Sequence, residues 1–147
     1  MGTTKSTPAS TPCLCNALRR ASRAVSRLYD QELRGVGLRT TQYSLLSFLH
    51  RSGEVRQGDL GPLTVLDETS LTRTLPPLVD RGWVAVREGK DRRERLVSIT
   101  PAGAAQVAKA RPAWERAQAR LRLALPGGVW ENLMDVLPEL TRLTDTA

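Results

Sequence analysis

The chain has 147 residues, 40% of them hydrophobic, which is enough for one ordinary core, alone or with added dimerisation helices. Lysines and arginines number 22 against 15 aspartates and glutamates, and the net charge of +7 suits a polyanionic partner. No apolar run is long enough to span a membrane. The chain has a single histidine and neither a Gly-rich phosphate loop nor paired catalytic carboxylates, so we expect no enzyme.

The N-terminal segment, residues 1–11, is rich in Thr, Ser and Pro and lacks the apolar stretch of a secretory signal. We therefore expect a disordered tail on a cytoplasmic protein. Cys13 and Cys15 follow it, and two cysteines this close together cannot staple a fold. That usage fits a reducing compartment, where thiols are spare, catalytic or sensory.

The segment 12–37 is predicted to form a first helix that takes part in dimerisation. Its apolar residues recur at alternating steps of four and three, which is the spacing of helices packed along a seam. These residues are Leu14, Leu18, Ala21, Val25 and Leu28. Gly35-Val36-Gly37 ends the helix, and a second helix follows from about Thr40 to Arg51.

Residues 38–100, which include that second helix, are predicted to form a winged helix-turn-helix domain. A short strand over 54–56 precedes a helix over 57–63 and then a longer helix that begins at Asp67. The carboxylate of Asp67 can cap the free N–H groups of the first turn. Gly82 can end the helix in a left-handed conformation.

The longer helix is expected to bury a leucine stripe, because Leu71, Leu75 and Leu78 repeat at helical spacing. Pro76-Pro77 lies within it, and we expect a bend there with the first two turns intact, because each proline removes a hydrogen bond. The remaining residues of its first half are expected at the sides or outside, and they are Glu68, Thr69, Thr72, Arg73 and Thr74.

A β-hairpin is predicted next, because two short runs rich in Val, Ile and Trp, 83–88 and 95–99, flank a charged tip over 89–94. Basic residues concentrate in this segment, whereas arginines scattered over a surface would only keep the protein soluble. A helix-turn-helix followed by a basic hairpin is a winged helix-turn-helix, and its usual task is to bind DNA.

Residues 101–147 are predicted to form two C-terminal dimerisation helices. Thr100-Pro101 is a helix start, since threonine caps and proline suits the first helical position. Residues 125–128 break this helix, and the last one runs from Val129 to about Leu143. Their apolar faces exceed what a small winged domain can cover, so we expect a second subunit as partner. Packing back onto the same chain is the alternative.

The hairpin also carries a family resemblance. Asp91-Arg92-Arg93, followed after five residues by Ile99-Thr100-Pro101-Ala102-Gly103, is similar to the Asp-x-Arg…Leu-Thr-x-x-Gly pattern of the MarR family of bacterial transcriptional regulators. The resemblance implies a mainly α fold with a small β-wing, and a homodimer whose terminal helices intertwine. It implies a cytoplasmic bacterial repressor on a pseudo-palindromic operator, released when a small ligand or an oxidant changes the spacing of the two winged lobes.

In the wing, the resemblance places Arg93 in the minor groove, where the negative potential favours a guanidinium. It gives Asp91 the role of orienting that arginine. Lys90 and Arg92 can reach phosphates, which position a protein on DNA without specifying sequence. The alternative for Arg93 is a solvated loop charge.

In the longer helix, Arg73 is the candidate for reading a base, because an arginine fork matches O6 and N7 of guanine. A salt bridge or a phosphate contact is its alternative. Thr69, Ser70 and Thr72 can serve phosphates or thymine methyl groups. The rival function is a winged-helix module that binds a protein and no DNA, but such a module would tolerate a neutral or acidic wing tip.

The first two helices resemble the organic-hydroperoxide-sensing branch of the family, through Leu14-Cys15…Ala21-Ser22…Leu28-Tyr29…Gly37-Leu38…Gln42-Tyr43. The resemblance aligns Cys15 with the reactive cysteine of that branch, and Tyr29 with a tyrosine that forms a hydrogen bond to that cysteine. The sequence departs from the branch at two further aromatic positions, which hold Thr40 and Arg19, and no distant second cysteine exists. The charge of Arg19, one turn along, would favour a thiolate, and Cys13 could resolve an oxidised Cys15 only if the helix start unwound.

The residues leave several roles open for this region. The cysteines can be inert packing at a dimer seam, redox or electrophile sensors, or ligands of a soft metal. We expect no zinc, because two thiolates alone leave a tetrahedral site half empty, and no cofactor. Alternatively, Tyr29, Tyr43 and nearby arginines could hold an aromatic acid in a pocket between the dimer helices and the winged lobe.

Overall fold

The computed structural model describes residues 12–64 and 66–145, so the tail expected over 1–11 lies outside it. The elements in chain order are α1 (Leu14–Leu33), α2 (Thr40–Ser52), β1 (Val55–Arg56), α3 (Leu60–Leu63), α4 (Glu68–Asp80), β2 (Val84–Glu88), β3 (Arg95–Ile99), α5 (Pro101–Ala124) and α6 (Val129–Asp145). The helix expected over 57–63 is a 3₁₀ turn, Gln57–Asp59, followed by the single turn of α3. None of the described helices is long and apolar enough to cross a membrane.

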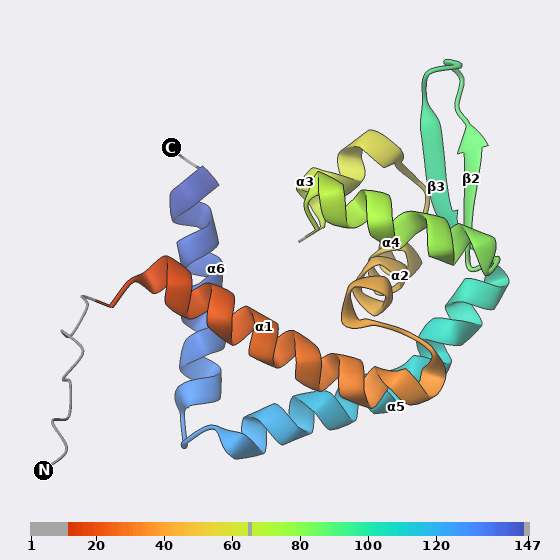
Figure 1. Ribbon diagram of the computed structural model, residues 1–147. Coiled ribbons are helices and arrows are strands. Elements are labelled where there is room, and N and C mark those ends of the chain that lie inside the picture. The colour runs from red at the N-terminus through yellow and green to blue at the C-terminus, as the bar shows by residue number, and fades with distance from the viewer. Residues whose placement is uncertain (1–11, 65, 146–147) are drawn as a thin grey trace, which may run out of the picture.

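The strands form one antiparallel sheet in the order β1-β3-β2. β2 and β3 pair from Val84 opposite Ile99 to Glu88 opposite Arg95, and β1 joins the other edge of β3. The β2–β3 hairpin projects beyond the helices that surround its base (Figure 1). The predicted wing and the short strand before it are both present, and the predicted winged helix-turn-helix fold is confirmed.

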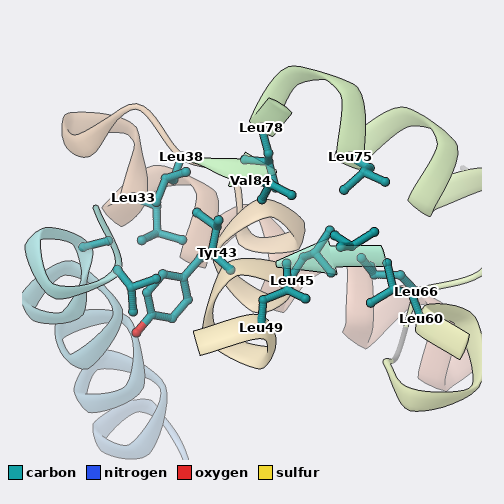
Figure 2. Close-up of a cluster of buried hydrophobic side chains, with 14 of the residues drawn as sticks. Leu33, Leu38, Tyr43, Leu45, Leu49, Leu60, Leu66, Leu75, Leu78 and Val84 are labelled. Carbon is teal, nitrogen blue, oxygen red and sulfur yellow. The ribbon is translucent and has the colours of Figure 1, made fainter. Parts of the chain in front are cut away.

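The core lies where α2, α4 and the sheet meet. Leu45, Leu46 and Leu49 of α2 are completely buried, together with Leu78 of α4 and Val97 of β3. Burying an aliphatic side chain of this size stabilises the fold by about 1.5–3 kcal/mol. Figure 2 shows Leu45 and Leu49 of α2 and Leu78 of α4 in one cluster. This cluster fixes α4 against α2 and leaves the opposite face of α4 to solvent.

The helix α4 begins at the predicted cap, and one prediction about its sides is wrong. The carboxylate of Asp67 accepts a hydrogen bond from the amide of Ser70 at 2.6 Å, and the helix runs unbroken across both prolines to Asp80. Thr74, however, is buried, with only 7% of its surface exposed. The reason is geometric: Thr74 lies three residues after Leu71 and four before Leu78, so it belongs to the same buried face.

The end of α1 is fixed to α5 by one carboxylate. Glu32 accepts hydrogen bonds from Arg120 at 2.7 Å and from Arg116 at 3.2 Å. These bonds, from Arg120 first and then Arg116, lower the pKa of Glu32 below its usual 4.5. The C-terminal end of α1 is therefore held against α5, which contains both arginines (Figure 1).

The outer helices leave much of their apolar surface uncovered. Leu14, Leu18 and Val25 are exposed on α1, although α1 repeats apolar residues at the seam spacing. On α6 the exposed fraction of Met134 is 48% and that of Val136 is 52%. Figure 1 shows α6 away from the winged domain, so α6 does not pack back onto that domain.

The wing joins α5 through a close backbone contact at Gly103. Thr100 donates its hydroxyl to the carbonyl of Gly82 at 2.6 Å and accepts the amide of Gly103 at 3.0 Å. The turn brings Gly103 so near β2 that an added Cβ would lie 2.1 Å from the carbonyl oxygen of Trp83. Only glycine fits there.

We predict that Gly103→Ala lowers the free energy of unfolding by about 1–3 kcal/mol, because the new methyl group must displace the Trp83 backbone. Helix propensity alone predicts the opposite sign, since alanine is the better helix former. Urea unfolding at fixed protein concentration measures the change. Gly35→Ala is the matched control, because nothing lies within 4 Å of its Cβ position. A neutral Gly103→Ala would contradict the close contact.

We also predict that the carboxylate of Glu32 titrates below 4.5 in an NMR pH titration. A carboxylate whose pKa falls on folding stabilises the fold above its unfolded value, and this contribution is lost as the pH falls through the folded value. The double change Arg116→Gln/Arg120→Gln should return the pKa of Glu32 toward 4.5, whereas Lys109→Gln on the same helix should not. An unchanged pKa in the double variant would contradict the ion pairs.

Candidate nucleic-acid interface

The solvent face of α4 carries the residues predicted to face DNA. Thr69, Thr72 and Arg73 are exposed and Ser70 is half-buried. The amide of Ser70 donates to the capping carboxylate of Asp67, and this hydrogen bond lowers the pKa of that carboxyl. Thr72 donates its hydroxyl to the carbonyl of Glu68 at 2.8 Å, so its methyl group and oxygen lone pairs remain available. Arg73 forms no ion pair with any residue that the structure describes.

The wing tip is a turn closed by three hydrogen bonds. The amide of Gly89 donates to the carbonyl of Glu94 at 2.9 Å, and the amide of Glu94 donates to the carbonyl of Asp91 at 2.9 Å. The carboxylate of Asp91 accepts the backbone amide of Arg93 at 3.1 Å. Asp91 therefore holds the backbone of the turn, and it forms no ion pair with the Arg93 guanidinium. The side chains of Lys90, Asp91, Arg92 and Arg93 are all exposed.

Two ion pairs attach the wing to the segment around β1. Arg56 pairs with Glu94 at the tip, and Arg87 of β2 forms a two-pronged pair with Glu54. The hydrogen bond from Arg87 lowers the pKa of Glu54. Both arginines are exposed, and an ion pair that water reaches adds little to stability. Their effect is positional, since they limit how far the hairpin can swing from the helix-turn-helix.

A groove of about 700 Å³ separates the wing from α4. Thr72 lies on its α4 side, and Arg93 and Arg95 lie on its wing side. Thr72 and Arg93 were predicted from the sequence as DNA-binding residues. Arg95 and Gln57, which also line the groove, were not. The pairing of β1 with β3 was the signal that could have found them, because it brings Gln57, directly after β1, beside the wing.

The residues predicted to sense an oxidant are not brought together within one chain. Cys13 and Cys15 are free and exposed, as is Arg19. Tyr29 is half-buried, and burial raises its pKa. Cys15 and Tyr29 lie fourteen residues apart on the same helix, roughly 21 Å along its axis. The expected hydrogen bond between them is therefore impossible within a subunit, and the expected packing of the cysteines is absent from the single chain.

A second cavity, of about 560 Å³, lies between α2, α5 and the segment before α4. Tyr43 stacks on Trp114 in its wall, with ring centroids 6.2 Å apart. Arg51 and Arg111 contribute positive charge to the same wall. The hydroxyl oxygen of Ser47, also in this wall, is buried and has no hydrogen-bond partner among the residues that the structure describes. Tyr29, the other tyrosine expected at such a pocket, does not line it.

Comparison with known proteins identifies relatives of this fold. A sequence model of the MarR family matches residues 36–94, from the start of α2 to the wing tip. An uncharacterized HTH-type transcriptional regulator of Bacillus subtilis, YwoH, is 30% identical over 87 residues, which cover 59% of this chain. That alignment spans 64% of the relative's own length, just under two thirds.

Solved structures match nearly the whole chain. The M. tuberculosis transcriptional regulator MosR, in complex with DNA, is 30% identical with a TM-score of 0.81, over 92% of this chain and 98% of that one. A mutant of E. coli MarR in complex with operator DNA has a TM-score of 0.76 over 86% of this chain and 92% of that one. At 22% identity this second likeness bears on the fold alone. The family model and the likeness to MosR show that the chain belongs to the MarR family of transcriptional regulators.

Proposed function

We propose that this chain is a homodimeric repressor that binds a pseudo-palindromic operator in double-stranded DNA. Each subunit presents α4 to the major groove and the wing to the minor groove. One observation carries the proposal: the exposed face of α4 and the basic wing tip border one groove, with Thr72 on one wall and Arg93 and Arg95 on the other. A protein-interaction module would have no need of this concentration of positive charge, and MosR was solved with DNA.

The roles within this interface follow from side-chain chemistry. Arg73 is exposed and has no ion pair within the described part of the chain, so its five donors remain available for guanine O6 and N7. Arg93 extends from a turn whose backbone Asp91 holds, which supports insertion of its guanidinium into a narrow minor groove. Lys90 and Arg92 are exposed beside it and suit phosphates. Thr69, Ser70 and Thr72 remain candidates for phosphate or thymine-methyl contacts.

The dimer is supported by the apolar surface of α1 and α6. Both helices expose large aliphatic side chains along their length, and a monomer rarely leaves a contiguous apolar patch of this kind open to water. A second subunit whose α1 and α6 interlock with these helices would cover them. The same arrangement would fix the separation of the two winged domains, which sets the half-site spacing.

Two routes to release from DNA remain supported. The cavity between α2 and α5 combines stacked rings with two arginines, which suits an aromatic carboxylic acid. The exposed thiol of Cys15 suits oxidation, since exposure and thiolate character govern reactivity. In that step the thiolate attacks the terminal oxygen of a hydroperoxide, a sulfenic acid forms, and the alcohol leaves. Condensation with the thiol of Cys13, once the start of α1 unwinds, would then form a disulfide and release water.

We predict that Arg73→Ala and Arg93→Ala weaken DNA binding in different ways. Loss of Arg73 should cost about 1–3 kcal/mol on the operator and little on random DNA, which relaxes sequence preference. Loss of Arg93 should weaken binding to both and reduce the salt slope by about one. Fluorescence anisotropy titrations with the region upstream of the protein's own gene and with random DNA measure both.

Arg20→Ala on α1 is the control for lost positive charge, and it should leave both affinities nearly unchanged. Equal losses on operator and random DNA for Arg73→Ala would overturn its role in reading a base. No binding by the wild-type chain to any double-stranded DNA would overturn the proposed function.

We predict that treatment with cumene hydroperoxide abolishes operator binding by the wild-type chain and leaves Cys15→Ser unaffected. The same titration measures this, and dithiothreitol should restore binding. In Cys13→Ser, excess hydroperoxide would oxidise the unresolved sulfenic acid of Cys15 further to a sulfinic acid, which thiols do not reduce. If this variant loses binding and no longer recovers under the reductant, Cys13 acts as the resolving thiol. Unchanged binding by the oxidised wild type would contradict the thiol route and leave the aromatic-acid cavity as the regulatory site.

A further inference from the structure

A third pocket, of about 520 Å³, lies where α1 connects to α2. Four arginines line it from three parts of the chain: Arg27 and Arg34 at the end of α1, Arg39 directly before α2, and Arg81 directly after α4. Its volume falls in the range of small-molecule sites, roughly 300–1,000 Å³. No residue of the proposed DNA interface or of the aromatic cavity lines this pocket.

The protein neutralises only part of the positive charge of this pocket. Asp30 is the one carboxylate in the lining, and its Oδ1 accepts the amide of Thr40 at 2.7 Å. Within residues 12–64 and 66–145, none of the four arginines forms an ion pair. Other arginines do find partners, such as Arg116 and Arg120 with Glu32. The pocket therefore concentrates charge that a bound anion would neutralise.

One of the four guanidinium groups is already held in place. Arg81 donates to the carbonyl of Gly37 at 2.6 Å, and its Cζ lies 4.9 Å from the ring centroid of Trp83. A cation above an aromatic face and one fixed hydrogen bond set the plane of the group while leaving further N–H donors unused. The N-terminus of α2 borders the same pocket through Arg39 and Gln42, and its dipole also favours an anion.

We propose that this pocket binds a small soluble oxyanion that carries at least two negative charges, such as a phosphate, pyrophosphate or polycarboxylate group. A planar guanidinium group donates two parallel hydrogen bonds to two oxygens of such a ligand, which favours a multiply charged oxyanion over chloride. The ligand would connect the end of α1 with the end of α4. In Figure 1 the α1–α2 connection lies at the lower right, near α5, whereas the wing tip is at the top. The ligand would therefore be separate from the proposed DNA interface.

Isothermal titration calorimetry of the full chain with inorganic pyrophosphate tests the proposal. We expect saturable binding with one site per subunit, and a loss of affinity of at least tenfold in Arg34→Gln/Arg39→Gln. The matched control is Arg20→Gln/Arg23→Gln, which removes the same charge from exposed positions of α1 outside the pocket and should change affinity less than twofold. Arg81→Lys keeps the charge but removes the planar fork, so it too should weaken binding.

Three results would overturn the proposal. The first is absence of saturable binding by the wild-type chain, and the second is an equal loss of affinity in the two double variants. The third is a loss of operator affinity in Arg34→Gln/Arg39→Gln, without pyrophosphate, that is well beyond the loss in the control. The last would mean that these arginines serve DNA phosphates. The melting temperature of each variant without ligand should match the wild type, and pyrophosphate should raise it in the wild type and the control only.

Discussion

The junction between the wing and α5 is the contact on which the rest of the fold depends. At one point the Thr100 hydroxyl bonds the carbonyl of Gly82, its amide bonds the carbonyl of Trp83, and Gly103 lies against that same carbonyl. These bonds tie the end of α4 and the start of β2 to the start of α5. A few backbone atoms therefore set the relative directions of α4, the wing and α5. A side chain at Gly103 would separate all three.

A second constraint is the mismatch between the outer helices and the core available to cover them. The buried cluster belongs almost entirely to the winged domain and the adjoining parts of α1 and α5, while the first half of α1 and nearly all of α6 face solvent in the single chain. One end of the chain is therefore fully packed, and the other has an apolar surface that a second subunit would bury. In the proposed homodimer, folding and assembly would be one equilibrium, because stability would depend on protomer concentration.

Local features of this fold were predictable from the sequence, and long-range ones were not. The Asp67 cap, the Thr100-Pro101 start and the hairpin each depend on residues within a few positions of one another, and all three are present. The burial of Thr74 was missed because the buried face of α4 is wider than the stripe that the three leucines mark. In the candidate site, α4 and the wing tip were found from motifs, whereas Arg95 was missed because its place depends on strand pairing. Cys15 and Tyr29 are far apart because each residue of a helix adds about 1.5 Å along its axis, and the sequence similarity alone did not show this separation.

The attachment of α1 at only one end has a mechanical consequence. Its last turns are held by Glu32 against α5, and the connection after it is held by Arg81 through the carbonyl of Gly37. The remaining length is a stiff rod anchored at the winged domain, and 20 residues of helix extend roughly 30 Å. A tilt of about 5° at the anchored end displaces the far end by roughly 2.6 Å over that length. Cys13 and Cys15 lie at the far end of this helix, so in the proposed homodimer a displacement there would be coupled to the tilt of α1 at the winged domain, and hence to the distance between the two wings.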